Sequence, residues 1–258
     1  MKTSISAALS RSWRGLTGAD RLCLAAVLLT LVAWALMPAM AQDPSYHRFA
    51  DQRQWLGVPH AADLLSNFAF ALVGVVGMVR LASPRRQRFS PPTEAGLRCI
   101  ALGLVCTAMG SAWYHRDPTD STLFWDRLPM TLVFAGVLGA AIAQRVGHKA
   151  GRASLALLVA LGIASVVYWK MTGDLSPYLT LQYGGIGALS FLLLLTRRGD
   201  DPIPWAWVLA WYVLAKAAEI ADQAIWDATR GVIAGHMLKH LLAAAAAAAA
   251  LWPLRARR

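Results

Sequence analysis

The segment Ser111-Ala-Trp-Tyr-His115 ends one apolar run, and a short acidic loop leads from it to Trp125-Asp126 at the start of the next run. On a helix, Ser111 and His115 lie four residues apart, so they share a face and are one turn from each other. The segment His236-Met-Leu-Lys-His240 repeats this spacing with two imidazoles. Polar side chains at these places in apolar runs require an explanation, and a bound metal is the first hypothesis to test.

The composition indicates a polytopic membrane protein. Hydrophobic residues make up 57% of the 258 residues and charged residues only 15%, with a mean hydropathy of +0.45, which is unusual for a soluble domain. The net charge of +11 does not indicate nucleic-acid binding, because Lys and Arg lie between the apolar runs rather than in one patch. The three cysteines all lie in apolar runs, which argues against a disulfide framework and a cysteine-ligated zinc.

The apolar runs predict an all-α fold, with a bundle of seven transmembrane helices in residues 61–258 preceded by one further apolar segment. Each run has the roughly 20 residues needed to cross a bilayer core. Continuous runs of this length form helices, because the backbone must satisfy its own hydrogen bonds in lipid. The connections are short, which indicates one domain. The expected spans are 61–82, 95–114, 122–144, 152–170, 177–196, 203–223 and 231–253.

Residues 1–41 combine a basic tail with an apolar run from Leu22 to Ala41. The run has the basic start and the Ala39-Met-Ala41 ending of a cleavable signal peptide. It is also long enough to remain as a transmembrane helix, which is the interpretation we favour. Both interpretations place the polar linker of residues 42–60 on the outer side of the membrane.

The distribution of basic residues predicts the orientation of the bundle. With residue 1 inside, most of the 25 Lys and Arg residues fall in inner segments, as the positive-inside rule requires. The C-terminus is then cytoplasmic, and polar residues from five helices fall at one level in the outer leaflet. These residues are Asp63, Ser66, Asn67, Ser111, His115, Asp126, Glu219, Asp222, His236 and His240.

The three histidines at this level predict a metal centre. Two imidazoles at positions i and i+4 of a helix point to one place, which is a known zinc half-site, and His115 adds a third. Three histidine ligands with an open position are typical of catalytic zinc, which lowers the pKa of bound water to about 7. Asp126 is then suited to act as general base, and Ser111 to orient a ligand or stabilise a developing oxyanion.

Each of these residues also has a simpler interpretation. A single interfacial histidine can be an amphipathic residue at headgroup level, and Asp126 or Asp63 can cap a helix. We favour function for the set as a whole, because ionisable groups in a membrane are costly.

Other polar and aromatic residues are given structural roles. Lys216 and Lys239 are expected to pair with Glu219 and Asp222 and so to hold the last two helices together. The loop histidines are expected to be solvated, with an approach of His60 to the site as the alternative for that residue. The tryptophans near helix ends are expected to anchor the interface. The loop histidines are His47, His60 and His148. The tryptophans are Trp113, Trp125, Trp205 and Trp252.

At these residues the chain resembles the alkaline ceramidases, which belong to a superfamily of seven-helix membrane hydrolases that also contains adiponectin-receptor-like proteins. The resemblance covers about residues 46–253 and is to the bacterial alkaline phytoceramidase-like branch. It rests on the spacing of Ser111, His115, Asp126, His236 and His240. Further matching segments are Phe49-Ala-Asp51-Gln-Arg53, Leu65-Ser-Asn67, Ala215-Lys216 with Glu219 and Asp222, and Gly235-His236-Met-Leu-Lys-His240.

The resemblance implies a zinc ion bound by His115, His236 and His240, a water activated near Asp126, and Ser111 in the site. It implies hydrolysis of the N-acyl bond of a ceramide-like lipid to a sphingoid base and a fatty acid. The implied location is a bacterial inner membrane, with the active site toward the outer leaflet. No sequence feature indicates an obligate protein partner.

Calcium is a point of departure from the family. The animal enzymes carry an acidic calcium-binding segment before their first helix. Here this segment has only Asp43, Asp51 and Asp63, mixed with His47, Arg48 and Arg53, which argues against bound calcium.

Two other classes of function stay open at this point. A lipid-sensing receptor or scaffold would use the same architecture with a structural zinc and no turnover. A proton or metal-ion transporter would use intramembrane acids as a relay. We rank the transporter low, because the ionisable groups lie in one leaflet and no polar line crosses to the inner side.

Overall fold

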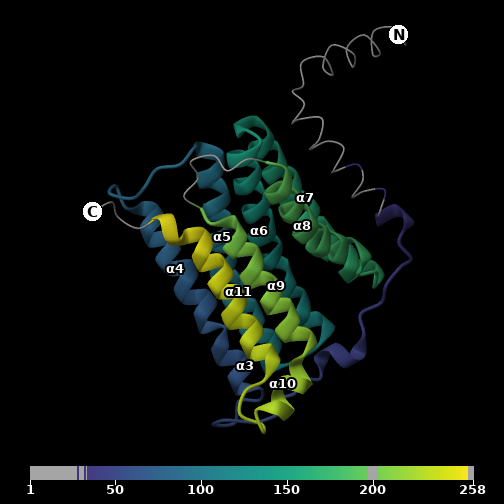
Figure 1. The fold of residues 1–258 in the computed structure, drawn as a ribbon. Helices are drawn as coiled ribbons and strands as arrows, with labels where there is room; N and C mark the ends of the chain where they lie inside the picture. Colours follow the sequence, from purple (N-terminus) through teal and green to yellow (C-terminus); the bar gives the residue numbers. More distant parts are fainter. Residues whose placement is uncertain (1–27, 29–31, 33, 197–202, 255–258) are drawn as a thin grey trace.

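The computed structural model describes Leu28, Val32, residues 34–196 and residues 203–254 (Figure 1). Within these residues every regular element is a helix, apart from an isolated bridge between Trp55 and Val58. The predicted all-α fold is therefore confirmed for the described residues. Of the predicted helix from Leu22 to Ala41, the structure describes Leu28, Val32 and residues 34–41. Leu28, Val32 and residues 34–36 are helical and residues 37–41 are not, so the helix ends before Ala41, and the remaining residues stay a prediction.

Six spans of the described residues are long and apolar enough to cross a membrane, which makes the chain a multi-pass integral membrane protein. Two of these spans combine two elements: Ala61–Ala82 contains α3 (Ala61–Ser66) and α4 (Phe68–Ala82), and Gly235–Leu254 contains α11 (Gly235–Leu251) and η2 (Trp252–Leu254). The other four are α5 (Pro91–Arg116), α6 (Asp120–Arg145), α7 (His148–Thr172) and α8 (Ser176–Leu195).

The predicted span at residues 203–223 is divided in the structure. Helix α9 (Trp205–Ile220) has 16 residues, which is short of the ~20 that cross a bilayer core, and α10 (Asp222–Ala228) follows it directly. The first span is also divided, between α3 and α4 at Asn67. Both breaks lie at the same end of the bundle, where α3 and α10 are found in Figure 1. We call this the site end.

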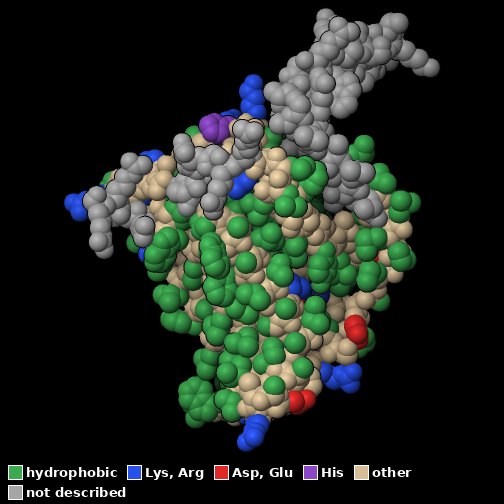
Figure 2. Space-filling model, in the orientation of Figure 1, with side chains coloured by type: hydrophobic (Ala, Val, Ile, Leu, Met, Phe, Trp, Pro, Cys, Tyr) green, Lys and Arg blue, Asp and Glu red, His purple; other side chains and the backbone are tan. Residues whose placement is uncertain are grey.

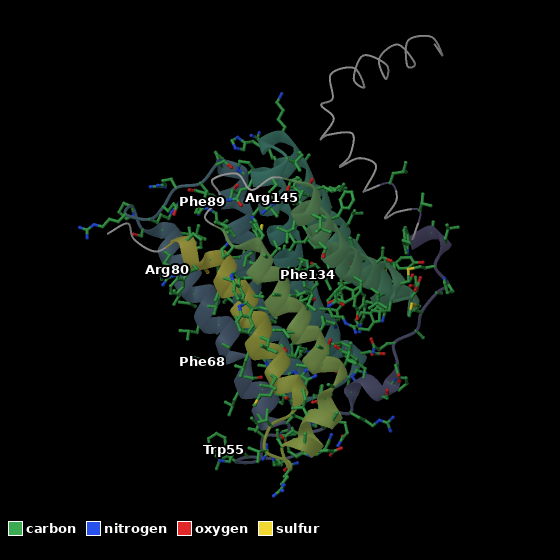
Figure 3. All side chains as sticks on the ribbon, viewed as in Figure 1. Trp55, Phe68, Arg80, Phe89, Phe134 and Arg145 are labelled. Carbon is green, nitrogen blue, oxygen red and sulfur yellow. The ribbon has the colours of Figure 1, made fainter. Side chains whose placement is uncertain are left out.

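Apolar side chains lie on the flank of the bundle, and basic side chains lie mainly near its two ends (Figure 2). Hydrophobic side chains cover most of the flank seen in Figure 2, and Lys and Arg gather mainly toward its ends. Figure 3 places Trp55 at the site end and Arg80 and Arg145 toward the opposite end. Phe68, on the outside of α4, is 69% exposed, as expected for a residue that faces lipid.

Small residues let the helices of the core approach closely. In the alanine-rich run of α11, Ala244, Ala246, Ala247 and Ala250 are buried against neighbouring helices, as small residues in membrane bundles usually are. One expectation about aromatic residues is wrong. Trp205 is 1% exposed and donates its indole N–H to Oε1 of Gln144 at 2.8 Å, so it packs inside the bundle and does not anchor the interface.

Helices α5 and α6 touch through their backbones at the site end. Pro129 lies inside α6 and has no N–H, so the carbonyl of Trp125 lacks the usual helical donor four residues later. Gly110 of α5 packs against this carbonyl so closely that an added Cβ would lie 2.0 Å from its oxygen. This contact sets Ser111, the next residue of α5, beside Asp126, the next residue of α6.

Substitution of Gly110 tests the importance of this contact. Gly110→Ala is expected to lower the free energy of unfolding by at least 1–3 kcal/mol, roughly the cost of overpacking, because the backbones must move apart. The measurement is thermal unfolding of the purified protein in detergent. Gly187→Ala on α8 is the matched control, since its Cβ would meet nothing within 4 Å and should leave stability unchanged or slightly higher. Equal effects of the two substitutions would contradict this account.

Candidate metal centre

Three buried histidines from two helices meet at the site end. His115 comes from the last turn of α5, and His236 and His240 come from the start of α11. Their exposed fractions are 0%, 4% and 2%, and their ring centroids form a triangle with sides of 4.9, 5.0 and 5.0 Å. One ring nitrogen of each lies within 4.8 Å of the other two, so the group could hold a metal ion.

His115 has the strongest need for such a ligand. Both of its ring nitrogens are buried and have no hydrogen-bond partner. A buried polar atom without a partner is costly, and native structures seldom keep one without a reason. A cation among the three imidazoles would bind the lone pair of one of these nitrogens.

His240 is held in one tautomer by Ser66 of α3. The Ser66 hydroxyl donates its proton to the carbonyl oxygen of Asp63 at 2.7 Å. It must therefore accept from Nδ1–H of His240, which lies 2.7 Å away. This leaves Nε2 of His240 with a free lone pair, the state that a metal ligand needs, and the arrangement matches the outer-shell support common around metal-binding histidines.

His236 lies next to a charged group that links α9 and α11. Lys239 donates to Nε2 of His236 at 2.9 Å and to Oε1 of Glu219 at 3.2 Å, and Glu219 also pairs with Lys216. The predicted pairing of both lysines with Glu219 is thus confirmed. A metal ion ligated at Nε2 of His236 would replace the contact with the ammonium group, and Lys239 would stay paired with Glu219.

Asp222 has a different role from the predicted lysine pair. Its Oδ1 accepts from the backbone N–H of His236 at 2.8 Å, which satisfies a free donor at the start of α11. Its Oδ2 accepts from the N–H of Ala50 at 3.0 Å. Gly235 lets the start of α11 approach the end of α9 and Asp222, since a Cβ there would lie 2.2 Å from the carbonyl oxygen of Ala218. Asp222 therefore fixes both the histidine helix and the linker.

The linker of residues 42–60 lies against two of the three histidines. The Phe49 ring centroid is 4.7 Å from that of His115 and 4.6 Å from that of His236. Nearby, Asp51 accepts two hydrogen bonds from the Arg53 guanidinium, at 2.9 and 2.6 Å. Burial favours a higher pKa for Asp51, but these bonds from Arg53 outweigh it and hold the pKa below its usual value. The Asp51 carboxylate is thus already occupied by the protein.

A cavity of about 340 Å³ opens beside the histidines and receives Ser111, Asp126 and His240. The Ser111 hydroxyl is buried, interacts with the Asp126 carboxylate and makes no other hydrogen bond among the described residues. His115 and His236 are not among the residues that line the cavity. The polar end of the cavity also includes Arg127, Lys216, Glu219 and Lys239.

The rest of the cavity is apolar and runs between α6, α8, α9 and α11. Its wall includes Phe134, which Figure 3 places about midway along the bundle. At the mouth, Tyr46 of η1 (Pro44–His47) donates to Oε1 of Glu219 at 3.1 Å. Burial raises the pKa of Tyr46 well above its usual value, and the charge of Glu219 raises it further, so the hydroxyl stays a donor. Further lining residues are Leu104, Val133, Val137, Leu138, Leu189 and Ala247.

Two predictions about the loop histidines are wrong, and His148 alone is exposed as expected. Nδ1 of His47 lies 3.0 Å from the Tyr114 hydroxyl, and its Nε2 lies 3.1 Å from Oδ1 of Asp120. His60 is partly buried, and its Nδ1 lies 3.0 Å from the carbonyl oxygen of Asp51. Both are held because the linker folds back onto the bundle, which no local sequence signal indicates.

Comparison of the chain with protein-family models, curated proteins and solved structures gave no match. The function is therefore argued from the geometry of these residues and from the spacing of Ser111, His115, Asp126, His236 and His240.

The hydrogen bond from His240 to Ser66 predicts how the metal affinity responds to substitution. Ser66→Ala should weaken zinc binding by roughly 10- to 100-fold, the usual effect of losing an outer-shell partner of a histidine ligand. The measurement is zinc retained by the purified protein against a graded series of chelators. Ser190→Ala is the control, because Ser190 makes the same kind of helical bond, to the Ile186 carbonyl, on distant α8. Unchanged retention in Ser66→Ala would contradict the assigned tautomer.

Proposed function

We propose that the protein is a zinc-dependent integral-membrane amidohydrolase that cleaves the N-acyl bond of ceramide-like lipids, releasing a sphingoid base and a fatty acid. The observation that carries this proposal is the buried group of His115, His236 and His240 next to a cavity that is polar at one end and apolar along the rest. A lipid amide needs both parts, one for its reacting bond and one for its acyl chain.

The donor set suits zinc. Three neutral imidazoles, with no thiolate in the group, are a common catalytic zinc set, and the two partnerless nitrogens of His115 fit a cation. Bound zinc supplies Lewis acidity, which polarises an amide carbonyl and makes water nucleophilic near neutral pH.

The residues of the chain supply the proton transfers and the positioning. The Asp126 carboxylate takes a proton from the water that attacks the amide carbonyl carbon, and then gives it to the departing nitrogen as the carbon–nitrogen bond breaks. The Ser111 hydroxyl, which lies beside the Asp126 carboxylate, donates to the oxygen of that carbonyl as negative charge develops there. The apolar wall holds the acyl chain and so fixes the amide near both residues.

The proposal includes a topology. We infer that α9, extended by α10, crosses as a seventh membrane helix, that the site end lies in the outer leaflet and that the C-terminus is cytoplasmic. The arginines at the opposite end, including Arg80, Arg86 and Arg145, suit the cytoplasmic side, where basic residues are enriched. These features agree with membership of the alkaline ceramidase family in its bacterial branch, and with an inner-membrane location.

Two substitutions test the proposed chemistry. His236→Ala should lose both zinc and amidase activity. Asp126→Asn should keep its zinc and lose at least about 100-fold in kcat, because the asparagine side chain cannot take a proton from water as the Asp126 carboxylate does. The measurements are zinc content by mass spectrometry and fatty acid released from ceramide in mixed micelles.

Asp227→Asn is the control for the second substitution, because Asp227 is exposed on α10 and its carboxylate bonds only to Gln223 among the described residues. It should retain full activity. Full activity in Asp126→Asn would contradict the assigned base. A zinc-containing protein with no turnover on any lipid amide would instead favour the receptor or scaffold, for which the metal is structural.

A further inference from the structure

A buried cation without a counter-ion lies on the cavity wall. Arg127 follows Asp126 on α6, lines the cavity and is 5% exposed. Its Nη2 donates to Oε1 of Gln42 at 2.7 Å, while its Nη1 is buried and has no partner. Among the described residues no carboxylate lies within the 4.0 Å of an ion pair with this guanidinium.

Aromatic rings hold the Arg127 guanidinium from several sides. Its Cζ lies 4.6 Å from the ring centroid of Trp169, 5.2 Å from that of Tyr178 and 5.3 Å from that of Tyr46. Cation–π contacts offset part of the cost of removing the charge from water, but they leave the N–H donors unused. The rings therefore fix where the group lies without satisfying Nη1.

The cost of this arrangement indicates a missing ligand. A buried charge is normally paired and hydrogen-bonded, and a buried donor without an acceptor costs free energy of its own. Gln42 accounts for Nη2 as a structural contact between the linker and α6, but nothing in the described part of the chain accounts for Nη1. An acceptor that enters through the cavity would supply the missing partner.

We propose that Arg127 forms an oxyanion subsite that binds the carboxylate or phosphate of a single-chain amphiphile, whose tail lies along the apolar part of the cavity. A guanidinium is the side chain best matched to such groups, because its parallel N–H donors bind two oxygens together. Phe134, Val137 and Leu189 line the part of the cavity that receives the tail. The subsite is separate from the histidine group, since its cage comes from α7, α8 and the linker.

Equilibrium dialysis of the full-length protein in nonionic detergent tests the subsite with three radiolabelled probes of equal chain length: palmitate, hexadecyl phosphate and hexadecanol. The wild-type protein should bind at least one of the two anions about tenfold more tightly than the neutral alcohol. The more tightly bound anion identifies the source, a free fatty acid if it is palmitate and a phosphate headgroup if it is hexadecyl phosphate. Equal affinities for all three probes would overturn the proposal, whatever any variant does.

Arg127→Gln should lose the preference for the anion, with hexadecanol binding unchanged. Arg116→Gln is the matched control, because Arg116 is exposed at the end of α5 and is not part of the cavity. If Arg127→Gln does not fold, Arg127→Lys takes its place. It should lower the affinity for the anionic probe several-fold, since lysine lacks the paired donors. If Arg127→Gln or Arg127→Lys still prefers the anionic probe over hexadecanol as the wild-type protein does, the Arg127 subsite is wrong.

His236→Ala separates this proposal from the zinc hydrolase. It should leave the preference for the anion intact even if zinc and activity are lost. If it abolishes the preference, the anion binds at the histidine group and the Arg127 subsite is wrong.

Discussion

A polar group buried in a membrane protein must find its partner inside the protein, because lipid offers none. At the site end most buried groups meet this requirement. Ser66 lies between the Asp63 carbonyl and His240, Asp222 caps α11, and Lys239 joins Glu219 to His236. The groups that fail it are informative for the same reason. They include both carboxylate oxygens of Asp63, the amide oxygen of Asn67, both ring nitrogens of His115 and Nη1 of Arg127. The last two residues lie where a ligand could supply a partner, His115 in the histidine group and Arg127 on the cavity wall.

The site depends on close backbone contacts as much as on the polar side chains. Gly110 lets α5 reach the carbonyl of Trp125, which Pro129 leaves without a helical donor, and this brings Ser111 toward Asp126. Gly235 plays the same part between α11 and α9. A larger residue at Gly110 would move α5, which carries His115, away from α6, which carries Asp126. A larger residue at Gly235 would move α11, which carries His236 and His240, away from α9, so the site and the packing cannot vary independently.

Much of this arrangement could be predicted from the sequence. The length of the apolar runs indicates helices, and the alternation of their ends is enough to place His115, His236 and His240 at one level. Arg127 could not be found in this way. From the sequence, Arg127 is only one more basic residue on the outer side of the membrane. Its burial depends on Trp169, Tyr178 and Tyr46, which are distant from it in sequence. The buried position of Trp205 and the folded linker were missed for the same reason, since they depend on tertiary contacts.

The position of Phe49 has a consequence for how water reaches the histidines. Its ring packs on His115 and His236, and the backbone N–H of the adjacent Ala50 bonds to Asp222, so a hydrocarbon ring that is fixed to the bundle covers this side of the two histidines. Of the three histidines, His240 alone lines the cavity, so solvent in the cavity meets the group at His240. An acyl chain bound there as proposed would displace that solvent, and its length would then set how much water reaches His240.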